Sequence, residues 1–517
     1  MMKTIQLQVS PEESSSNKQL KVIVANIISL DPNDISHIEI IKRSIDARQK
    51  IIKINLKIDV YINEKFKKNP ELKFNFKNTK KKSAVIIGAG PAGLFAALRL
   101  IEKGIKPIIF ERGKDVKNRR RDLAKITKEH IVNIDSNYCF GEGGAGTYSD
   151  GKLYTRSKKR GDVDRILDLL VFHGAPSDIK VDAHPHIGTN KLPKIIENIR
   201  KTILEFGGEI HFNSRVIDII IENKKINGIQ LKDNSIVKCN KLILATGHSA
   251  RDIFEILFQK EILIEAKSFA LGVRVEHTQE LIDQIQYKCT DRGEYLPPAP
   301  YSIAKQVNDR GVYSFCMCPG GIIAPCATKP GEVVTNGWSP SKRNGPKSNS
   351  GIVVELKISD FEKFKQHGPL SAMKFQEDIE TNACKVAGNT QNVPAQRLLD
   401  FLEDKVSSSL PKTSYGPGLS SVDMRKIFPK FIIENLKEGF KLFGKQMKGY
   451  LTNEAILHAP ESRTSSPVRI PRDRDTLEHL EISGFYPCGE GAGYAGGIIS
   501  AAIDGEKCAE MCANSLK

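Results

Sequence analysis

At 517 residues the chain is too long for one hydrophobic core, so we expect two or three domains. It is 40% hydrophobic and 27% charged, with no apolar run near the roughly 18 residues of a membrane span and no signal-peptide core in residues 1–10. It is therefore typical of a soluble cytoplasmic protein whose ten cysteines stay reduced. The net charge of +17 does not by itself indicate a nucleic-acid partner, because nearly half of the excess lies in residues 1–83, mostly as scattered lysines.

The first part of the chain is predicted to be a small α/β domain, residues 1–76. Apolar and polar residues alternate over 4–9 and 51–62, which favours strands, and 18–28 has a helical pattern. A polar, basic run at 77–83 follows and is typical of a solvated linker rather than a localisation signal.

The most informative stretch begins after this linker. An apolar, β-branched run at 84–87 predicts a buried parallel strand, and Gly88, Gly90 and Gly93 follow at dinucleotide-fingerprint spacing. A helical pattern over 94–103 and a second apolar strand over 107–110 complete the unit, which ends at Glu111. Strand, glycine turn, helix, strand and acid in this order predict a Rossmann-type domain.

Each residue of this unit has a predicted role. Gly88 makes the tight turn, Gly90 lets the backbone approach a pyrophosphate, and Gly93 lets the helix pack closely on the strand. The helix N-terminus supplies its dipole and free N–H groups to the phosphates. Glu111 would accept a hydrogen bond from a ribose 2′-hydroxyl.

A meander is predicted between residues 209 and 239. Strand patterns cover 209–221, 226–231 and 236–239, and a fully apolar strand at 242–245 runs into Thr246 and Gly247. This order of elements resembles that of two-domain flavoproteins, in which the meander covers the parallel sheet and the turn after the apolar strand passes close to the cofactor.

Two further glycine clusters differ in context. The cluster at 141–146 follows no clear strand and precedes no helix, so it is interpreted as a flexible loop that contacts phosphate or ribityl groups. The cluster at 489–497 follows a strand-like segment and opens a helix over 498–512, whose N-terminus would stabilise negative charge on a reduced flavin; packing alone is the alternative. Since only the first cluster has the complete context, we expect one dinucleotide and no second Rossmann domain.

The sequence pattern changes over 267–455. Proline-rich irregular segments there separate strand-like pieces, and helical patterns follow later. We interpret this region as an inserted α+β substrate or cap domain, with the chain returning near Ile456. The predicted fold class is thus α/β, with a discontinuous Rossmann-type domain formed by 84–266 and 456–517, a β-meander, the inserted domain and the small N-terminal domain.

Several of these motifs resemble known proteins. Residues 85–94, Glu111 with Arg112, and 245–247 resemble the FAD-binding superfamily that contains p-hydroxybenzoate hydroxylase and geranylgeranyl reductase. The motifs at 140–153, 311–321, 461–470 and 489–497 resemble the FAD-dependent dehydrogenase family of bacteria and plastids, also described as NAD(FAD)-utilising dehydrogenase-like. This resemblance covers about residues 20 to 510. It implies non-covalently bound FAD and an oxidoreductase, with NAD(P)H as a transient reductant, but no particular substrate.

The chain departs from the superfamily at one position. Glu490 stands where an Asp usually precedes the last glycine cluster, and the extra methylene shifts the carboxylate that would contact the ribityl chain. The residues that we expect to bind the cofactor are Gly88, Gly90, Pro91, Ala92, Gly93, Glu111, Arg112, Gly143, Gly144, Val216, Ala245, Thr246, Gly247, Gly489, Glu490, Gly497 and Ile498.

The cysteines near residue 320 leave three interpretations open. Cys316 and Cys318, with Cys326 seven residues further on, could pack in a strand, form a redox dithiol or bind a metal. A CxC pair is a weak metal signal, and no His follows at zinc-finger spacing, so we expect no metal.

Three further sets of residues are candidates for substrate chemistry. His248 directly follows the turn near the cofactor and would either contact it or cap the turn, whereas His184 and His186 lie in a predicted loop. Arg463 and Arg469 lie where flavin and substrate would meet and could hold a carboxylate or phosphate. An interdomain ion pair with Glu461 or Asp473 is the alternative for these arginines.

Three functions follow from these patterns. We favour an FAD-dependent oxidoreductase, a dehydrogenase or reductase, acting on a small organic substrate that the arginines would suit if it is anionic. The alternatives are an FAD-dependent RNA-modifying enzyme, which the basic charge permits, and a non-catalytic flavin-binding partner or assembly protein.

Overall fold

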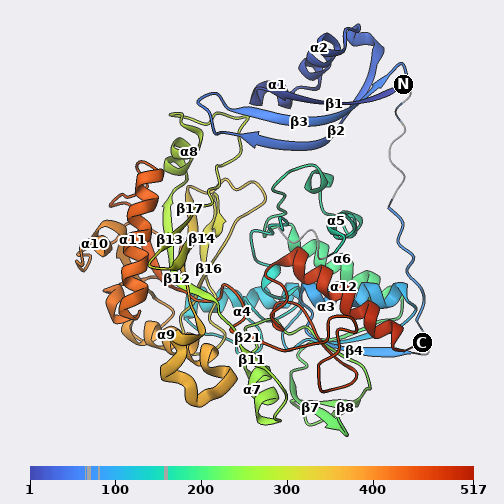
Figure 1. The fold of residues 1–517 in the computed structure, drawn as a ribbon, viewed down its shortest axis with the longest axis vertical. Helices are drawn as coiled ribbons and strands as arrows, with labels where there is room; N and C mark the ends of the chain where they lie inside the picture. Colours follow the sequence, from blue (N-terminus) through green and yellow to red (C-terminus); the bar gives the residue numbers. More distant parts are fainter. Residues whose placement is uncertain (65, 67–71, 80–81, 156–160, 517) are drawn as a thin grey trace.

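A computed structural model describes residues 1–64, 66, 72–79, 82–155 and 161–516. A small sheet at the N-terminus lies above two larger units, one built on a parallel sheet and the other on a large mixed sheet (Figure 1). Residues 80 and 81 of the predicted linker lie outside the described residues.

The N-terminal sheet has the order β1–β3–β2 and is antiparallel. Its strands and helices are β1 (Met2–Val9), α1 (Pro11–Ser15), α2 (Asn17–Ile28), β2 (Ile35–Asp46) and β3 (Lys53–Ile62). Leu20 and Val24 of α2 pack with Leu56 and Ile58 of β3 in the core of this unit. Strand β2 was not predicted, because bulges after Ile35 and Ile40 interrupt its alternation of apolar and polar residues.

The N-terminal unit contacts both larger units. Arg43 of β2 pairs with Asp182 at 2.8 Å, and Lys288 Nζ donates a hydrogen bond to the Arg48 carbonyl at 2.6 Å. The half-buried side chains of Ala47 and Ile52 pack against the core of the large mixed sheet. The hairpin of β2 and β3 therefore joins the rest of the molecule through charged as well as apolar contacts.

The parallel sheet has the order β22–β10–β4–β5–β6. Its strands are β4 (Ser83–Ile87), β5 (Lys106–Phe110), β6 (Glu209–His211), β10 (Leu242–Leu244) and β22 (Phe485–Pro487). Around it lie α3 (Pro91–Glu102), α4 (Val116–Glu129), α5 (Val163–Phe172), α6 (Leu192–Glu205), α7 (Arg251–Gln259) and α12 (Ile498–Asn514). This arrangement confirms the predicted Rossmann-type fold class.

The two faces of this sheet are covered differently. Ala84 and Ile86 of β4 face the core formed with α3, α6 and α12, whereas Val85 and Ile87 face α7 and the meander. The meander consists of β7 (Val216–Glu222), β8 (Lys225–Leu231) and β9 (Ile236–Lys238). The single strand predicted over 209–221 is therefore wrong: it is two strands, because the chain turns at 212–215 from the parallel sheet into the meander.

The large mixed sheet has the order β13–β14–β17–β12–β20–β18–β19. Its strands are β12 (Ala270–Thr278), β13 (Ala304–Val307), β14 (Arg310–Cys318), β17 (Lys347–Glu355), β18 (Val393–Arg397), β19 (Leu419–Ser421) and β20 (Ile456–Glu461). The helices of this region are α8 (Gln279–Tyr287), α9 (Ser371–Val386), α10 (Leu398–Leu402) and α11 (Lys430–Gln446), of which α11 packs on β13, β14 and β17. Two small sheets pair β11 (Glu265–Ala266) with β21 (Val468–Arg469) and β15 (Ile322–Pro325) with β16 (Thr335–Trp338).

The chain rejoins the parallel sheet late. Strand β20 begins at Ile456, where we placed the return of the chain, but it pairs with β12 and β18 of the large sheet. The chain joins the parallel sheet again only at β22. The domain boundaries stay predictions.

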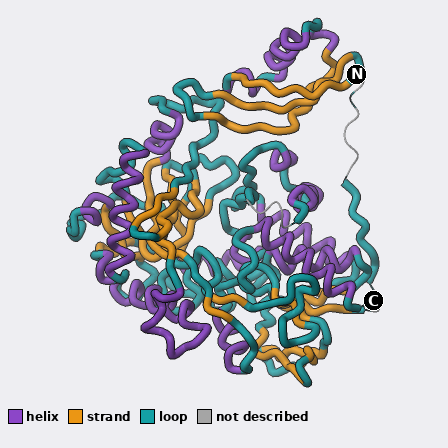
Figure 2. The backbone as a smooth tube through the Cα atoms, viewed as in Figure 1, coloured by secondary structure: helices purple, strands orange, loops and turns teal. Residues whose placement is uncertain are grey.

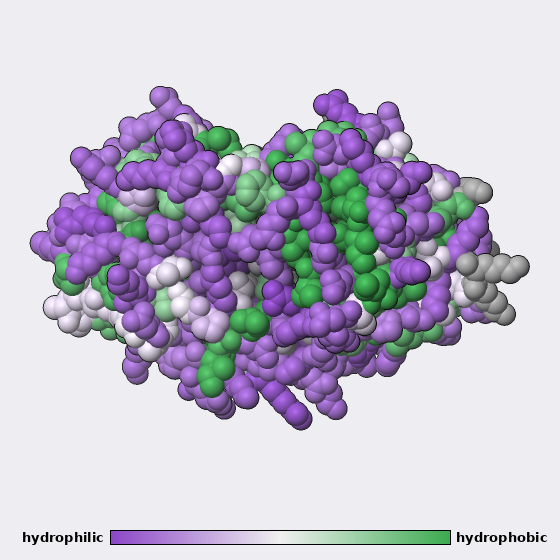
Figure 3. Space-filling view, turned by 90° about the horizontal axis from the view of Figure 1, so that it is seen from below, coloured by the Kyte–Doolittle hydropathy of each residue, from purple (hydrophilic) through white to green (hydrophobic). Residues whose placement is uncertain are grey.

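Helices and strands are mixed throughout the body of the molecule (Figure 2). Among the described residues, no helix combines the length and the apolar character that a membrane crossing requires. The face seen from below is mainly hydrophilic, with smaller hydrophobic areas between the charged side chains (Figure 3).

The contact between α3 and α12 gives a testable prediction. An ideal Cβ on Gly505 of α12 would lie 2.1 Å from the Ala92 carbonyl oxygen of α3, so the two backbones meet without room for a methyl group. We expect Gly505→Ala to destabilise the protein by about 1–3 kcal/mol through overpacking, although helix propensity alone favours Ala by about 1 kcal/mol. Thermal unfolding followed by circular dichroism measures the change.

The matched control is Lys507→Ala, at an exposed position of the same helix. A thermal midpoint for Gly505→Ala that equals or exceeds that of the wild type would contradict the close approach of α3 and α12.

Candidate active site

A cavity of about 390 Å³ opens at the carboxyl ends of β4, β5 and β10. The N-terminal residues of α3 and α12 form part of its wall, and residues from β14 and the loops around it close the opposite side. Carboxyl ends of parallel strands are where α/β folds place their ligands. The predicted site residues that line this cavity are Gly88, Gly90, Pro91, Ala92, Glu111, Arg112, Gly144, Val216, Ala245, Thr246, Gly247, His248, Cys316, Arg463, Glu490, Gly497 and Ile498.

Glycine is required at two positions of the fingerprint turn. Gly88 has φ +100°, and an ideal Cβ there would lie 2.5 Å from the Ala245 carbonyl oxygen. A Cβ on Gly93 would lie 2.0 Å from the Gly88 carbonyl oxygen. The roles predicted for these glycines, a tight turn and close packing of helix on strand, agree with this geometry.

Gly90 differs from these two glycines. Its nearest neighbour to an ideal Cβ is the Gly144 Cα atom at 3.9 Å, so the protein itself leaves room for a methyl group on the cavity side. Gly90 is the N-cap of α3, and Pro91 occupies the first helical position, where no backbone N–H is needed. The space beside Gly90 is therefore open to a ligand.

Glu111 is a buried carboxylate that binds three backbone segments. Its Oε2 accepts a hydrogen bond from the Ala89 N–H at 2.8 Å, and its Oε1 accepts from Gly113 and Gly141, each at 2.9 Å. A carboxylate offers about four acceptor positions, of which these hydrogen bonds use three, and Glu111 borders the cavity. Glu111 thus fixes the fingerprint turn and the 141–146 loop together.

Charged residues surround the part of the cavity next to Glu111. Arg112 donates to Asp252 at 2.9 Å and to Asp135 at 3.1 Å, and its guanidinium lies 4.2 Å from the centre of the Phe140 ring. Arg215 also pairs with Asp252, at 3.0 Å. Of these, only Arg112 was predicted as a site residue; Asp135, Phe140 and Arg215 lie in loops, and Asp252 lies in the first turn of α7.

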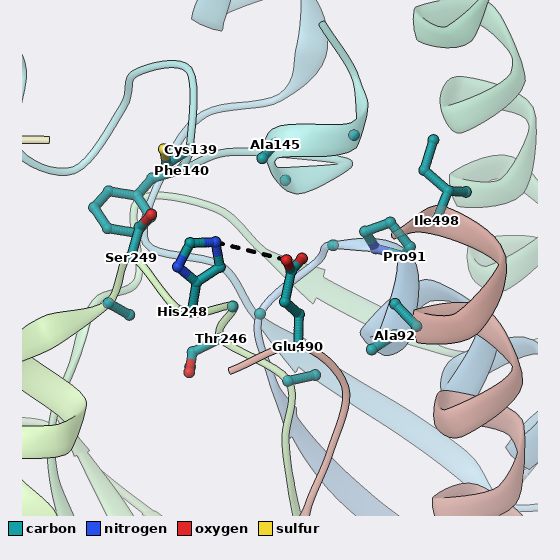
Figure 4. Close-up of a pocket in the computed structure, with 18 of the residues that line it drawn as sticks. Pro91, Ala92, Cys139, Phe140, Ala145, Thr246, His248, Ser249, Glu490 and Ile498 are labelled. Atoms are coloured by element: carbon teal, nitrogen blue, oxygen red, sulfur yellow. Dashed lines mark ion pairs between the residues drawn. The ribbon is translucent and has the colours of Figure 1, made fainter. Parts of the chain in front are cut away.

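Glu490 and His248 face each other across the cavity (Figure 4). Burial raises the pKa of Glu490 to about 7, against the opposing effect of Lys267. Burial, together with the positive charges of Arg463 and Arg251, lowers the pKa of His248 to about 3. The 3.6 Å contact between the two side chains therefore joins a neutral imidazole to a carboxyl group that titrates near neutral pH.

Arg463 belongs to a buried ionic cluster with Arg251, Glu332 and Glu380. Glu380 accepts hydrogen bonds from Arg463 at 2.8 Å and from Arg251 at 2.7 Å, and Glu332 accepts from Arg251 at 2.7 Å. The expected alternative, an ion pair of Arg463 with Glu461 or Asp473, is corrected here. Glu461 pairs with Arg274 at 2.7 Å instead, and Asp473 caps the turn at Thr476.

Two polar nitrogens at the cavity wall lack partners. Among the described residues, the structure gives no hydrogen-bond acceptor for Arg463 Nη1 and no partner for His248 Nδ1, although both atoms are buried. Buried donors normally find a partner. These two atoms therefore retain hydrogen-bonding capacity that no described residue uses.

Other predicted residues lie away from the cavity wall. Gly93, Gly143, Gly489 and Cys318 are not among its lining residues, and Arg469 is exposed, with its guanidinium 5.3 Å from the Tyr494 ring centre. His186 binds the Ser341 carbonyl at 3.0 Å. The structure thus separates Arg469 from Arg463.

A buried trio of Cys488, Asp504 and Cys508 has ligand atoms within 4.8 Å of one another. However, Arg472 donates to Asp504 at 3.0 Å and to Cys508 at 3.2 Å, and the Gly489 N–H donates to Asp504 at 2.7 Å. The carboxylate is thus already neutralised by a guanidinium. This arrangement does not favour a cation between the three residues.

Comparison with known proteins agrees with this geometry. Residues 82–285 match the family described as pyridine nucleotide-disulphide oxidoreductase, residues 268–464 match "FAD-dependent protein, C-terminal domain-like", and residues 1–61 match a domain of unknown function. An uncharacterized protein of Clostridium beijerinckii is 42% identical over 503 residues, which cover 93% of each chain. The thiamine thiazole synthase of Aeropyrum pernix is 24% identical over 181 residues, covering 32% of this chain and 54% of that protein.

Two solved structures illustrate the similarity, each at a low TM-score. CtdE in complex with FAD has a TM-score of 0.33 at 11% identity, covering 83% of this chain and 84% of that one. Glycine oxidase from Bacillus cereus has a TM-score of 0.31 at 14% identity, covering 84% and 96%.

The matched segments define the class of the protein as an FAD-dependent oxidoreductase. Within this class, the chain belongs to the family of the Clostridium beijerinckii protein, with which it aligns over nearly its whole length.

The ionic cluster gives a prediction about stability. Glu380→Gln leaves two buried arginines with one carboxylate, and we expect a loss of about 3–5 kcal/mol at pH 7. Because the pKa of Glu380 is lowered to about 2, its contribution is present above about pH 4.5 and disappears as the pH falls through about 2. Thermal midpoints of wild type and variant should therefore differ at pH 7 and converge in acid.

The control is Asp378→Asn, which removes the same charge from an exposed position of α9. Equal midpoints for Glu380→Gln and Asp378→Asn at pH 7 would contradict a stabilising role for the cluster.

Glu490 gives a prediction of opposite sign. A carboxyl group whose pKa is raised on folding binds more protons in the folded state, so its ionisation destabilises the protein as the pH rises from about 4.5 to 7. Without bound cofactor, Glu490→Gln should unfold at the same temperature as the wild type at pH 4.5 and at a higher temperature at pH 8.

Glu481→Gln, at an exposed position, should show no such change between the two pH values. A Glu490→Gln midpoint that follows the wild type at both pH values would exclude a raised pKa.

Proposed function

We propose that the cavity holds FAD non-covalently through the lining residues predicted from the sequence. One observation carries this proposal. The open space at Gly90, the N-termini of α3 and α12, and Glu111 all border the same cavity. Helix N-termini favour anions such as a pyrophosphate. Glu111 retains an acceptor position for a ribose hydroxyl, and Gly497 and Ile498 would face the redox-active ring.

The bound flavin supplies two-electron redox chemistry, and the side chains of the chain supply orientation and proton handling. Glu490 can take up or release a proton near neutral pH, since its pKa is raised to about 7. His248, whose pKa is lowered to about 3, remains a neutral hydrogen-bonding group. These two side chains suit a reaction that moves a proton together with the electron pair.

Arg463 favours an anionic organic substrate. Its Nη1 is buried at the cavity wall without a partner among the described residues, while its other nitrogens are held by Glu380, Glu332 and Thr328. A fixed guanidinium with one free N–H edge suits a carboxylate or phosphate oxygen. We propose NAD(P)H as the transient electron donor, and membership of the p-hydroxybenzoate hydroxylase and geranylgeranyl reductase superfamily, on the motifs described above.

The central test has two parts. The first identifies the cofactor that the wild type releases on denaturation, and the second measures FAD binding by the Gly90→Ala variant. The methyl group fits the protein but occupies the space proposed for the pyrophosphate. Losing one charge-assisted hydrogen bond of about 1.5–3 kcal/mol should weaken FAD binding about ten- to a hundredfold. Flavin fluorescence after denaturation and titration of the apoprotein with FAD measure the effect.

Gly311→Ala is the matched control, because Gly311 lies outside this cavity and an added Cβ would meet the end of the Glu355 side chain at 3.3 Å and the Tyr313 ring at 3.6 Å. Failure of the wild type to release or bind FAD would overturn the proposal. Full binding by Gly90→Ala would overturn the assigned place of the pyrophosphate.

The electron donor and the alternative functions are separated by two further observations. Bleaching of the flavin on anaerobic mixing with NADH or NADPH supports the reductant. Salt-dependent RNA binding would favour the RNA-modifying alternative, and bound flavin without turnover would favour an assembly role.

A further inference from the structure

Cys316 lies at an irregular point of β14, where the strand meets the cavity. Phe315 pairs with Gly351 and Cys318 with Asn349 of β17, so Cys316 and Met317 form a bulge between two regular pairs. Cys316 has φ +46°, a left-handed conformation that non-glycine residues seldom adopt. Cys316 and its neighbour Phe315 both line the cavity.

The bulge bears on the distance between the two cysteines. Two residues of fully extended chain span about 6.6–7.2 Å, which is close to the limit of about 6.8 Å between the Cα atoms of a disulfide. The chain is not fully extended here, because three residue steps from Phe315 to Cys318 lie opposite two steps from Gly351 to Asn349. The Cys318 thiol already lies close, donating to the Cys316 carbonyl at 3.3 Å.

Positive charge surrounds the Cys316 sulfur. Lys152 Nζ lies 4.0 Å from it, and Arg274 Nη1 donates to the Cys316 carbonyl at 3.4 Å. Lys152 is fixed by the Met317 carbonyl and by Asp150, whose carboxylate lies 3.7 Å away. Lys152 belongs to the 140–153 motif, but the sequence alone assigned it no role.

The two thiols differ in acidity. The neighbouring Cys318 thiol, with the charges of Lys152 and Arg274, lowers the pKa of Cys316 well below its ordinary value despite burial and the opposing charge of Asp150. The neighbouring Cys316, with burial, raises the pKa of Cys318 well above its ordinary value. Glu461 and Glu490 also face this region, and their negative charges oppose ionisation of Cys316. One thiolate beside one thiol is the arrangement of an attacking and a resolving cysteine.

We propose that Cys316 and Cys318 form a redox-active dithiol at the cavity wall that reacts with small disulfides, with Cys316 as the attacking residue and Lys152 as its positioning residue. The inference adds a thiol site to the proposed function and can be tested on protein without FAD.

The cysteine pair can reduce a small disulfide, RSSR, without any further reactant. The Cys316 thiolate attacks one sulfur of a disulfide RSSR, forming a Cys316–S–S–R bond and releasing RS⁻. Cys318 passes its proton to RS⁻ and attacks the Cys316 sulfur, which forms the Cys316–Cys318 disulfide and releases the second RS⁻. RSSR gains two electrons and the cysteine pair loses two. Returning the disulfide to a thiol and a thiolate takes two electrons and one proton, which is the chemistry that reduced FAD supplies when bound.

The first test is the alkylation of the full-length protein by iodoacetamide at several pH values, with each cysteine followed by peptide mass spectrometry. At pH 7 we expect Cys316 to react about tenfold faster than half-buried Cys289, because the thiolate is the nucleophile and each pKa unit changes its fraction about tenfold. Lys152→Met should move the pH midpoint of Cys316 upward, and Lys152→Arg should restore it. A Cys316 rate no faster than that of Cys289, or a midpoint unaffected by Lys152→Met, would overturn the assignment.

The second test uses 5,5′-dithiobis(2-nitrobenzoic acid) as the small disulfide. The wild type should release two equivalents of thiolate per cysteine pair and yield a peptide linking Cys316 to Cys318. Cys318→Ser should stop at a stable adduct on Cys316, whereas Cys316→Ser should give neither product, and Cys289→Ser should behave as the wild type. Thermal midpoints show whether each variant is folded.

A folded Cys318→Ser protein without an adduct on Cys316 would overturn the proposal. The linked peptide in a protein that binds no FAD would support the dithiol and count against the proposed cofactor site. Bound FAD without the linked peptide would do the reverse.

Discussion

The buried carboxylate of Glu111 holds three backbone segments at one end of the cavity. It accepts hydrogen bonds from Ala89 in the fingerprint turn, from Gly113 after β5 and from Gly141 in the second glycine loop. Since each buried N–H would otherwise lack an acceptor, this single side chain sets the relative positions of the turn, the strand end and the loop. The cavity depends on those positions, because all three segments contribute to its wall.

At the opposite end of the cavity, ion pairs between side chains replace the backbone hydrogen bonds found at Glu111. Arg251 of α7, Glu380 of α9, Glu332 and Arg463 form a buried cluster of two cations and two anions that joins the parallel-sheet unit to the inserted region. Arg463 Nη1 has no partner among the described residues, and the positive charges of Arg463 and Arg251 add to the effect of burial in lowering the pKa of His248. Arg463 thus belongs both to this ionic cluster and to the cavity wall.

Much of the cavity wall was predictable because many of its residues belong to short local motifs. The fingerprint from Gly88 to Glu111 and the turn at Ala245 and Thr246 follow from strand periodicity and glycine spacing, which are local properties. Arg215, Asp252 and Lys152 were not predicted, since they lie in separate segments, Asp252 in the first turn of α7, and their partners are distant in sequence. Strand β2 and the break between β6 and β7 were missed for a related reason, because bulges and turns interrupt the alternation on which strand prediction depends.

By itself the sequence determined that this protein contains a Rossmann-type unit. An apolar strand, a glycine turn, a helix and an acid follow one another in the order typical of that unit. Only the tertiary structure decided what surrounds that fold. It separated Arg469 from Arg463, exchanged the expected partners of Arg463 for Glu380 and Glu332, and brought Lys152 to within 4.0 Å of Cys316. Burial and charge act through space, so contacts between residues more than a hundred positions apart cannot be read from local patterns.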